Sequence, residues 1–173
     1  MSTTRPPRSP RRSAPRPTER QIAARLAHAE AHCRERGVQL TAQRAEVYEL
    51  LLRRRGSAKA YDLQHDLQQR RGRVAPTTIY RALDFLVEQG LVHRVDALNR
   101  FVACSHDADD AEGHHPLFLV CEICERTTEL HDDAALAGLA RSLDAAGADF
   151  VQSAVEVKGL CRDCRDYEHE HEH

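Results

Sequence analysis

Four cysteines stand in two pairs of identical spacing, Cys121-Glu-Ile-Cys124 and Cys161-Arg-Asp-Cys164. Two intervening residues let both thiolates of a pair face one ion, and two such pairs supply the four soft ligands of a tetrahedral zinc site. A redox-active dithiol is the alternative, but it does not account for a second pair. We therefore predict a structural Zn²⁺ site that is closed to water and stabilises a small domain.

The elements around these cysteines predict a small mixed domain over residues 117–165. Strand patterns cover residues 117–121, 126–130 and 150–157, and an Ala/Leu-rich helix covers residues 134–146 after two aspartates. The final segment, residues 166–173, alternates Glu and His, and we interpret it as a short solvated tail. The gap between the two cysteine pairs, residues 125–160, leaves room for a strand, a helix and a second strand.

Charge divides the chain into two halves of opposite sign. Residues 1–20 and residues 21–103 each carry a net charge of +5, whereas residues 104–173 carry −12 and hold seven of the eleven histidines. A basic front half indicates that this half faces a polyanion, and the Arg- and Pro-rich residues 1–19 are typical of a disordered basic tail. No apolar run is long enough for a membrane span, and six cysteines without a signal-like segment favour a cytoplasmic protein.

The basic half has the pattern of a winged helix-turn-helix over residues 20–104. Helical periodicity starts at Gln21, at Thr41 as an N-cap, at Ala60 and at Pro76, and each run stops at a glycine. The glycines are Gly37, Gly56, Gly72 and Gly90. Two short extended runs, 91–96 and 100–104, then follow as a hairpin. The alternative is a plain helical bundle. The predicted fold class is α+β, with a winged helix, a hinge over 105–116 and a small α/β domain.

The fourth helix has the pattern of a recognition helix. Ile79, Leu83, Leu86 and Val87 form its apolar face, whereas Tyr80 and Arg81 point to the opposite side in its second turn. The N-terminal part of a recognition helix meets base edges in the major groove of DNA. We predict DNA contacts from Tyr80, Arg81, Thr78 and Arg44.

Four further side chains of metal-ligand type lie far apart in the sequence: His93, Cys104, His114 and Glu129. Each alone is unremarkable, and spacing alone does not gather them into one site.

Several motifs in order resemble the ferric uptake regulator (Fur) family, and within it most closely the zinc uptake regulator branch (Zur). The motifs are Leu40-Thr-Ala-Gln-Arg44, Ala60-Tyr-Asp-Leu63, Thr77-Thr-Ile-Tyr-Arg-Ala-Leu-Asp-Phe-Leu86, Glu88-Gln-Gly90 and the two cysteine pairs with Gly159-Leu160 before the second. The resemblance covers about residues 21–165. It implies a metal-dependent repressor whose N-terminal winged helix binds DNA and whose C-terminal domain forms a homodimer.

The resemblance also implies two zinc ions per chain. The four paired cysteines would hold the structural ion, and His93, Cys104, His114 and Glu129 would hold a regulatory ion that bridges both domains. Whether His114 or the adjacent His115 is the ligand stays open. One thiolate among these ligands favours Zn²⁺ over Fe²⁺ or Mn²⁺.

The implied function is a zinc-responsive repressor that binds a palindromic operator as a dimer and shuts off zinc-uptake genes. An iron- or manganese-responsive repressor is the alternative within the family. A zinc hydrolase is the alternative from another class, but four protein ligands leave no position for an activated water, so we expect no enzyme.

Overall fold

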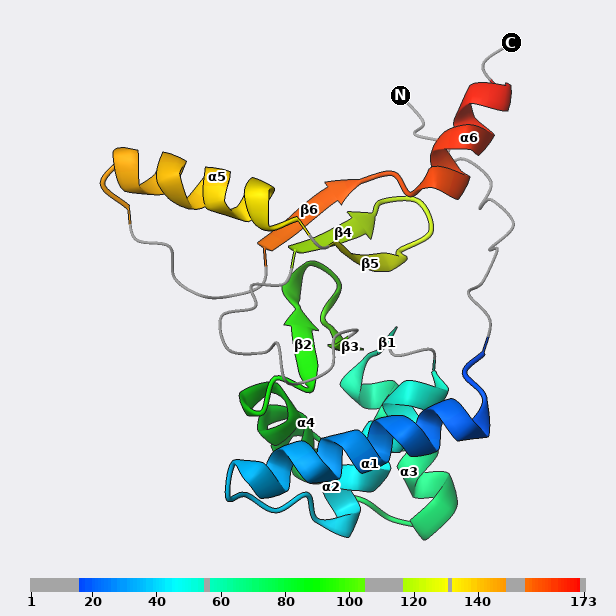
Figure 1. Cartoon of the computed structure of the whole chain (residues 1–173). Helices are drawn as coiled ribbons and strands as arrows, with labels where there is room; N and C mark the ends of the chain where they lie inside the picture. The colour runs from blue at the N-terminus through cyan, green and yellow to red at the C-terminus, as the bar shows by residue number, and fades with distance from the viewer. Residues whose placement is uncertain (1–15, 55–56, 105–116, 131, 149–154, 172–173) are drawn as a thin grey trace. The chain divides into compact units, whose positions relative to one another are not determined.

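The computed structural model describes residues 16–54, 57–104, 117–130, 132–148 and 155–171 (Figure 1). These residues fall into two compact units, one that ends at Cys104 and one that starts at Leu117. The predicted hinge, residues 105–116, lies outside the described residues, as does most of the predicted basic tail. Each unit is described by itself.

Four helices form most of the N-terminal unit: α1 (Glu19–Glu35), α2 (Ala42–Arg53), α3 (Ala60–Arg71) and α4 (Pro76–Glu88). Thr18 caps α1 in a capping box with Gln21, so Thr18 and Glu19, which the sequence prediction assigned to the tail, belong to the helix start. Thr41 caps α2 as predicted, its hydroxyl accepting from the Arg44 N–H at 3.4 Å. The helix α2 packs against α1, α3 and α4 and lies at the centre of this unit.

A three-stranded antiparallel sheet completes the N-terminal unit. Its strands are β1 (Ser57–Ala58), β2 (Val92–Val95) and β3 (Arg100–Ala103), in the order β1-β3-β2. The connection between β2 and β3 contains η1 (Asp96–Leu98) and ends at Asn99, a non-glycine residue with φ of +48°. The hairpin was predicted, whereas the two-residue β1 was not, because so short a strand has no alternation to detect. The helices α2, α3 and α4, followed by this hairpin, form the predicted winged helix-turn-helix.

The core of this unit is built mainly from Leu and Ala side chains, with fewer Val and Ile and few aromatic rings. Ile79, Leu83 and Leu86 are buried on α4 as predicted. Val87 was assigned to the same face, but it is 38% exposed, and Phe85 is buried in its place. Successive residues of a helix are turned by about 100°, which puts Val87 at one margin of the apolar stripe of α4 and Phe85 at the other. The neighbouring helices cover the margin that holds Phe85.

The C-terminal unit is a second three-stranded sheet with two helices: β4 (Leu117–Cys121), β5 (Thr127–Leu130), α5 (Asp133–Ala145), β6 (Val155–Gly159) and α6 (Arg162–His171). The strand order is β5-β4-β6, with β4 antiparallel to β5 and parallel to β6. A parallel pair needs a crossover, which here contains α5. The fold class is therefore α+β, as predicted.

Two boundaries in the C-terminal unit differ from the sequence prediction. The third strand continues to Gly159, because its pairing with β4 extends to the Cys121–Gly159 pair. Residues 166–171, predicted as part of a solvated tail, continue α6, which starts directly after Cys161. Among the described residues, no helix is long and apolar enough to cross a bilayer.

The burial on α4 predicts a large difference between two neighbouring substitutions. Leu83→Ala removes a fully buried side chain and leaves a cavity, so we expect it to lower the free energy of unfolding of this unit by about 2–5 kcal/mol. Val87→Ala, the matched control at an exposed position, should cost about 1 kcal/mol or less. Urea unfolding followed by circular dichroism measures both. Equal losses would contradict the assignment of the buried face.

Candidate metal centres and nucleic-acid surface

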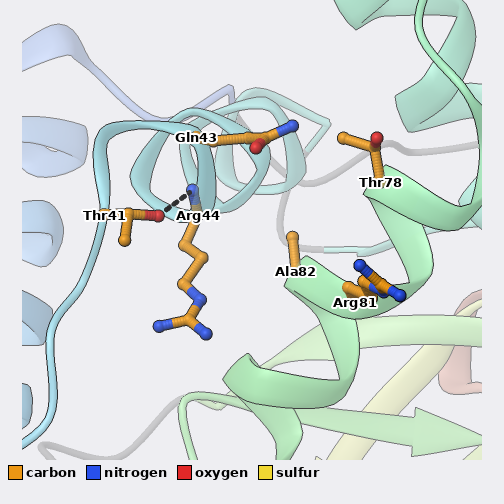
Figure 2. A pocket seen from close by; sticks show the side chains of 6 residues that line it. All are labelled: Thr41, Gln43, Arg44, Thr78, Arg81 and Ala82. Carbon is orange, nitrogen blue, oxygen red and sulfur yellow. Dashed lines mark hydrogen bonds between the residues drawn. The ribbon is translucent and has the colours of Figure 1, made fainter.

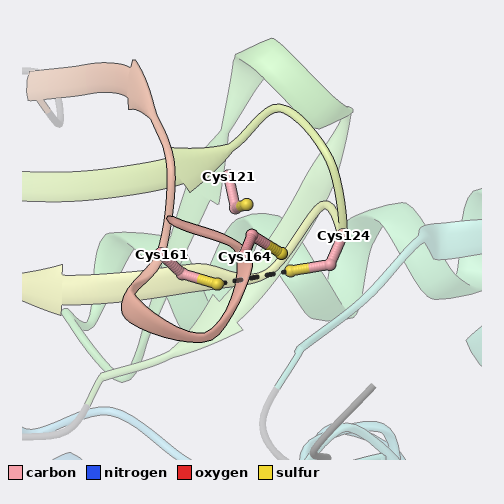
Figure 3. Close-up of side chains that lie close together, drawn as sticks. All are labelled: Cys121, Cys124, Cys161 and Cys164. Carbon is pink, nitrogen blue, oxygen red and sulfur yellow. Dashed lines mark hydrogen bonds between the residues drawn. The ribbon is translucent and has the colours of Figure 1, made fainter. Parts of the chain in front are cut away.

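The four paired cysteines meet in the C-terminal unit (Figure 3). Their sulfur atoms all lie within 4.8 Å of one another, and Cys124 Sγ and Cys161 Sγ are 3.7 Å apart. Cys121, Cys161 and Cys164 are buried and Cys124 is half-buried. The predicted gathering of these residues is therefore present in the structure.

The sheet places the two cysteine pairs at one end. Cys121 ends β4, and the neighbouring parallel strand β6 ends at Gly159, so both Cys-x-x-Cys loops follow strands that stop at the same level. The Glu122 N–H donates to the Gly159 carbonyl at 2.9 Å and joins the start of the first loop to the end of β6. At Gly159 an added Cβ would lie 3.2 Å from Leu119 Cδ1, which favours glycine at this point.

Each loop is closed by backbone hydrogen bonds. In the first, the Cys121 N–H donates to the Arg126 carbonyl and the Glu125 N–H donates to the Cys121 carbonyl, both at 2.9 Å. Glu125 has φ of +58°, so the chain turns sharply there without a glycine. In the second, the Cys164 N–H donates to the Cys161 carbonyl at 3.0 Å. These bonds hold the thiols in place from the backbone.

The thiols of the first pair differ in how readily they ionise. Burial opposes ionisation of Cys121, but N–H groups of Cys124, Cys161 and Ile123 point at its sulfur and lower its pKa to about 6. Burial and the neighbouring cysteines raise the pKa of Cys124 to about 12. The lowered pKa of Cys121 favours its thiolate, which is the form that binds a metal ion.

The donor set fits one metal well. Four sulfur ligands at this spacing suit tetrahedral Zn²⁺, and because all four positions are taken by protein, the ion would have a structural role. Cys121 and Cys124 would hold it from the first loop, and Cys161 and Cys164 from the second.

A second pair of candidate ligands lies in the N-terminal unit. One ring nitrogen of His93 on β2 and Sγ of Cys104, directly after β3, are within 4.8 Å of one another. The backbone of Cys104 is held on both sides. Its N–H donates to the Leu91 carbonyl at 3.0 Å, and its carbonyl accepts from the guanidinium of Arg25, which also donates to the Tyr48 hydroxyl at 3.3 Å. Arg25 was not identified from the sequence, because a helix pattern does not show which carbonyl a long side chain reaches.

The other two predicted regulatory ligands lie outside the described part of this unit. Glu129 lies on β5 of the C-terminal unit, opposite Phe118 of β4. His114, with its alternative His115, lies outside the described residues.

The predicted DNA-contacting residues lie at the starts of α2 and α4. Tyr80 is 49% exposed and Arg81 is also exposed, whereas Thr78 is half-buried. Both helix starts line a cavity of about 280 Å³, whose walls Figure 2 shows: Thr41, Gln43, Arg44, Thr78, Arg81 and Ala82.

Arg44 is engaged within the protein. Its guanidinium lies 3.6 Å from the centroid of the Phe85 ring and donates to the Gln39 carbonyl at 2.7 Å. A cation over a buried ring is attracted by the electron density of its face, so Arg44 braces α2 against α4. This contact was not predicted.

The fold and the sites together define a two-unit protein in which a winged helix precedes a small sheet domain with a four-cysteine metal centre. Residues 35–158 match the model of the Ferric uptake regulator family, and the chain belongs to this family. The family resemblance is thereby confirmed, and so is the prediction that the protein is a regulator and not an enzyme.

Relatives and solved structures from one branch are similar to this chain. The zinc uptake regulation protein of Escherichia coli (strain K12) is 36% identical over 152 residues, which cover 83% of this chain and 82% of the relative. The zinc uptake regulation protein of Mycobacterium tuberculosis (strain H37Rv) is 32% identical over 132 residues, 75% of this chain and 96% of the relative.

Among solved structures, a zinc uptake regulator complexed with zinc and DNA has a TM-score of 0.77 at 33% identity and covers 88% of this chain and 99% of its own. The structure of holo XcZur has a TM-score of 0.71 at 36% identity and covers 83% and 98%.

The four-cysteine geometry predicts that one serine substitution destroys the centre. Cys121→Ser leaves three sulfur ligands and removes binding energy that is also folding energy, about 10–16 kcal/mol for structural zinc peptides. We expect a protein that is insoluble or monomeric and has lost this zinc, as measured by metal analysis and size-exclusion chromatography. Cys33→Ala is the control, because Cys33 is equally buried but lies outside the cluster. Unchanged zinc content in Cys121→Ser would contradict the assignment.

Proposed function

We propose that this protein is a zinc-responsive transcriptional repressor. It binds palindromic operator DNA as a homodimer when its regulatory site holds Zn²⁺, and it shuts off zinc-uptake genes. The observation that carries this proposal is the likeness to a zinc uptake regulator complexed with zinc and DNA, at 33% identity over 88% of this chain. Because its target is chromosomal DNA, we place the protein in the cytoplasm.

The proposed metal content is two Zn²⁺ per chain. The first is structural, on Cys121, Cys124, Cys161 and Cys164, and is supported by the sulfur cluster. The second is regulatory, with the ligand set His93, Cys104, His114 and Glu129. The proximity of His93 and Cys104 within the winged-helix unit supports half of this set.

The chemistry of the second set favours zinc as the signal. A thiolate is a soft ligand, which suits Zn²⁺ better than the Fe²⁺ or Mn²⁺ of the alternative reading. Both relatives described above are zinc uptake regulation proteins, which agrees with this choice of metal.

The proposed DNA surface is the N-terminal half of α4. Arg81 is exposed and would reach a purine edge, with guanine preferred because its O6 and N7 accept two hydrogen bonds from one guanidinium. Tyr80 would meet a thymine methyl or a phosphate, and we propose a phosphate contact for Thr78. For Arg44 we propose a mainly indirect role, since its guanidinium already holds α4 through Phe85.

The proposed mechanism is thermodynamic linkage between metal and DNA. His93 and Cys104 belong to one unit and Glu129 to the other, so filling the regulatory site fixes how the units are arranged, and with them the spacing of two recognition helices in a dimer. A two-fold dimer then matches a palindromic operator. If zinc binds the DNA-competent arrangement better, DNA affinity must rise by the factor by which DNA raises zinc affinity. The corresponding coupling free energy is typically about 1–3 kcal/mol.

The recognition-helix assignment predicts a loss of specific DNA binding in Arg81→Ala. Loss of a bidentate guanine contact costs about 1–3 kcal/mol, so we expect roughly 5- to 150-fold weaker binding to an operator selected from a random duplex library. Fluorescence anisotropy at fixed salt measures the affinity. Arg141→Ala, an exposed arginine on α5, is the control. If Arg81→Ala binds this operator as tightly as the unsubstituted protein, α4 does not read bases through Arg81.

The two-site division predicts a different defect for Cys104→Ser than for Cys121→Ser. Cys104 belongs to a unit with its own core, so the variant should stay a soluble dimer with one zinc per chain. Its DNA affinity should no longer rise on zinc addition, whereas the unsubstituted protein gains about 5- to 150-fold. Zinc counting, size-exclusion chromatography and DNA titration decide it. A full zinc response, or loss of the dimer, would show that Cys104 has another role.

A further inference from the structure

An ion pair joins the two cysteine loops independently of any metal. Arg126 lies two residues after the first pair, and its guanidinium donates to the carboxylate of Asp163 at 2.8 Å. Asp163 stands between the two cysteines of the second loop. The side chains are 34% and 36% exposed, so the pair is only partly covered by protein.

Arg126 also closes the first loop through its backbone. Its carbonyl accepts from the Cys121 N–H at 2.9 Å, and its own N–H donates to the Cys124 sulfur. One residue therefore contacts both cysteines of the first loop by backbone and the second loop by side chain. None of these contacts was foreseen from the sequence, where Arg126 was only the first residue of a predicted strand.

The charge of Arg126 is suited to its place. Four thiolates around one Zn²⁺ leave a net charge of −2, which a nearby cation stabilises. An arginine guanidinium is protonated at any physiological pH, so Arg126 carries a permanent positive charge. The negative charge of Asp163 alone would repel the thiolates, and the positive charge of Arg126 offsets this repulsion.

We propose that Arg126 is a positioning residue for the four-cysteine site, which through its ion pair with Asp163 holds the two loops together and slows the loss of zinc. The inference rests on the proposed function of this cluster as a zinc site. We take zinc release to require that one cysteine loop separates from the other, and here that movement must also separate Arg126 from Asp163. Partners outside the ligand shell typically change metal affinity 10- to 100-fold. Because this ion pair is partly exposed, we expect an effect at the lower end of this range, about tenfold.

The test measures the rate of zinc release. Full-length protein carrying Cys104→Ser, which weakens the regulatory site, is mixed with an excess of a chromogenic chelator, and the metal transferred is followed by absorbance. We expect Arg126→Met to release zinc about tenfold faster. Asp163→Asn should also release zinc faster, but by a smaller factor, because Arg126 stays beside the sulfur cluster. The double variant should be no faster than Arg126→Met, since both single changes remove the same contact. Arg126→Lys should release zinc more slowly than Arg126→Met, because it keeps the positive charge.

A matched control lies just after the second cysteine pair. Arg165 also pairs with a carboxylate, Asp166, but at 3.7 Å and with both side chains 60% exposed, and Arg165→Met should release zinc at the unsubstituted rate. The proposal is overturned if Arg126→Met releases zinc no faster than Arg165→Met, or if the Arg126 and Asp163 effects multiply. If the parent protein holds no chelator-resistant zinc at all, the zinc site itself fails, which is a separate result.

Discussion

The parallel pairing of β4 with β6 is the constraint on which the C-terminal unit depends. It brings Cys121 level with Gly159, so that the two Cys-x-x-Cys loops emerge side by side from neighbouring strands. A parallel pair must be connected over the sheet, which explains why the two cysteine pairs are separated by a helix and not by a short turn. Metal bound by these loops would in turn fasten the ends of both strands. The sheet and the metal centre therefore stabilise each other.

In the N-terminal unit, the packing holds α4 on one side and leaves its other side exposed. Burial of Leu83 and its neighbours fixes α4 from below, and Arg44 braces it from α2 through the ring of Phe85. Tyr80 and Arg81 remain exposed on this helix. In the same unit, hydrogen bonds to Arg25 and Leu91 hold the backbone of Cys104. The proposed regulatory ligand is therefore fixed to α1 and to the residue before β2.

Sequence patterns were sufficient for most of the fold and for the four-cysteine site. Capping residues such as Thr41 mark helix starts, and the spacing of Cys121 to Cys124 carries its own geometry. What the sequence did not show depends on tertiary contacts. The exposure of Val87, the short strand β1 and the ion pair of Arg126 with Asp163 are set by which elements become neighbours. Likewise His93 and Cys104 became a candidate pair through family resemblance, because eleven positions in the chain separate them.

Whether zinc controls DNA binding is decided by a DNA titration of the full-length protein with and without Zn²⁺, combined with metal analysis of the same sample. At fixed ionic strength, we expect two zinc ions per chain, and an affinity for the selected palindromic duplex about 5- to 150-fold higher with the regulatory site filled. Affinity that is equal with one and with two zinc ions bound would contradict it.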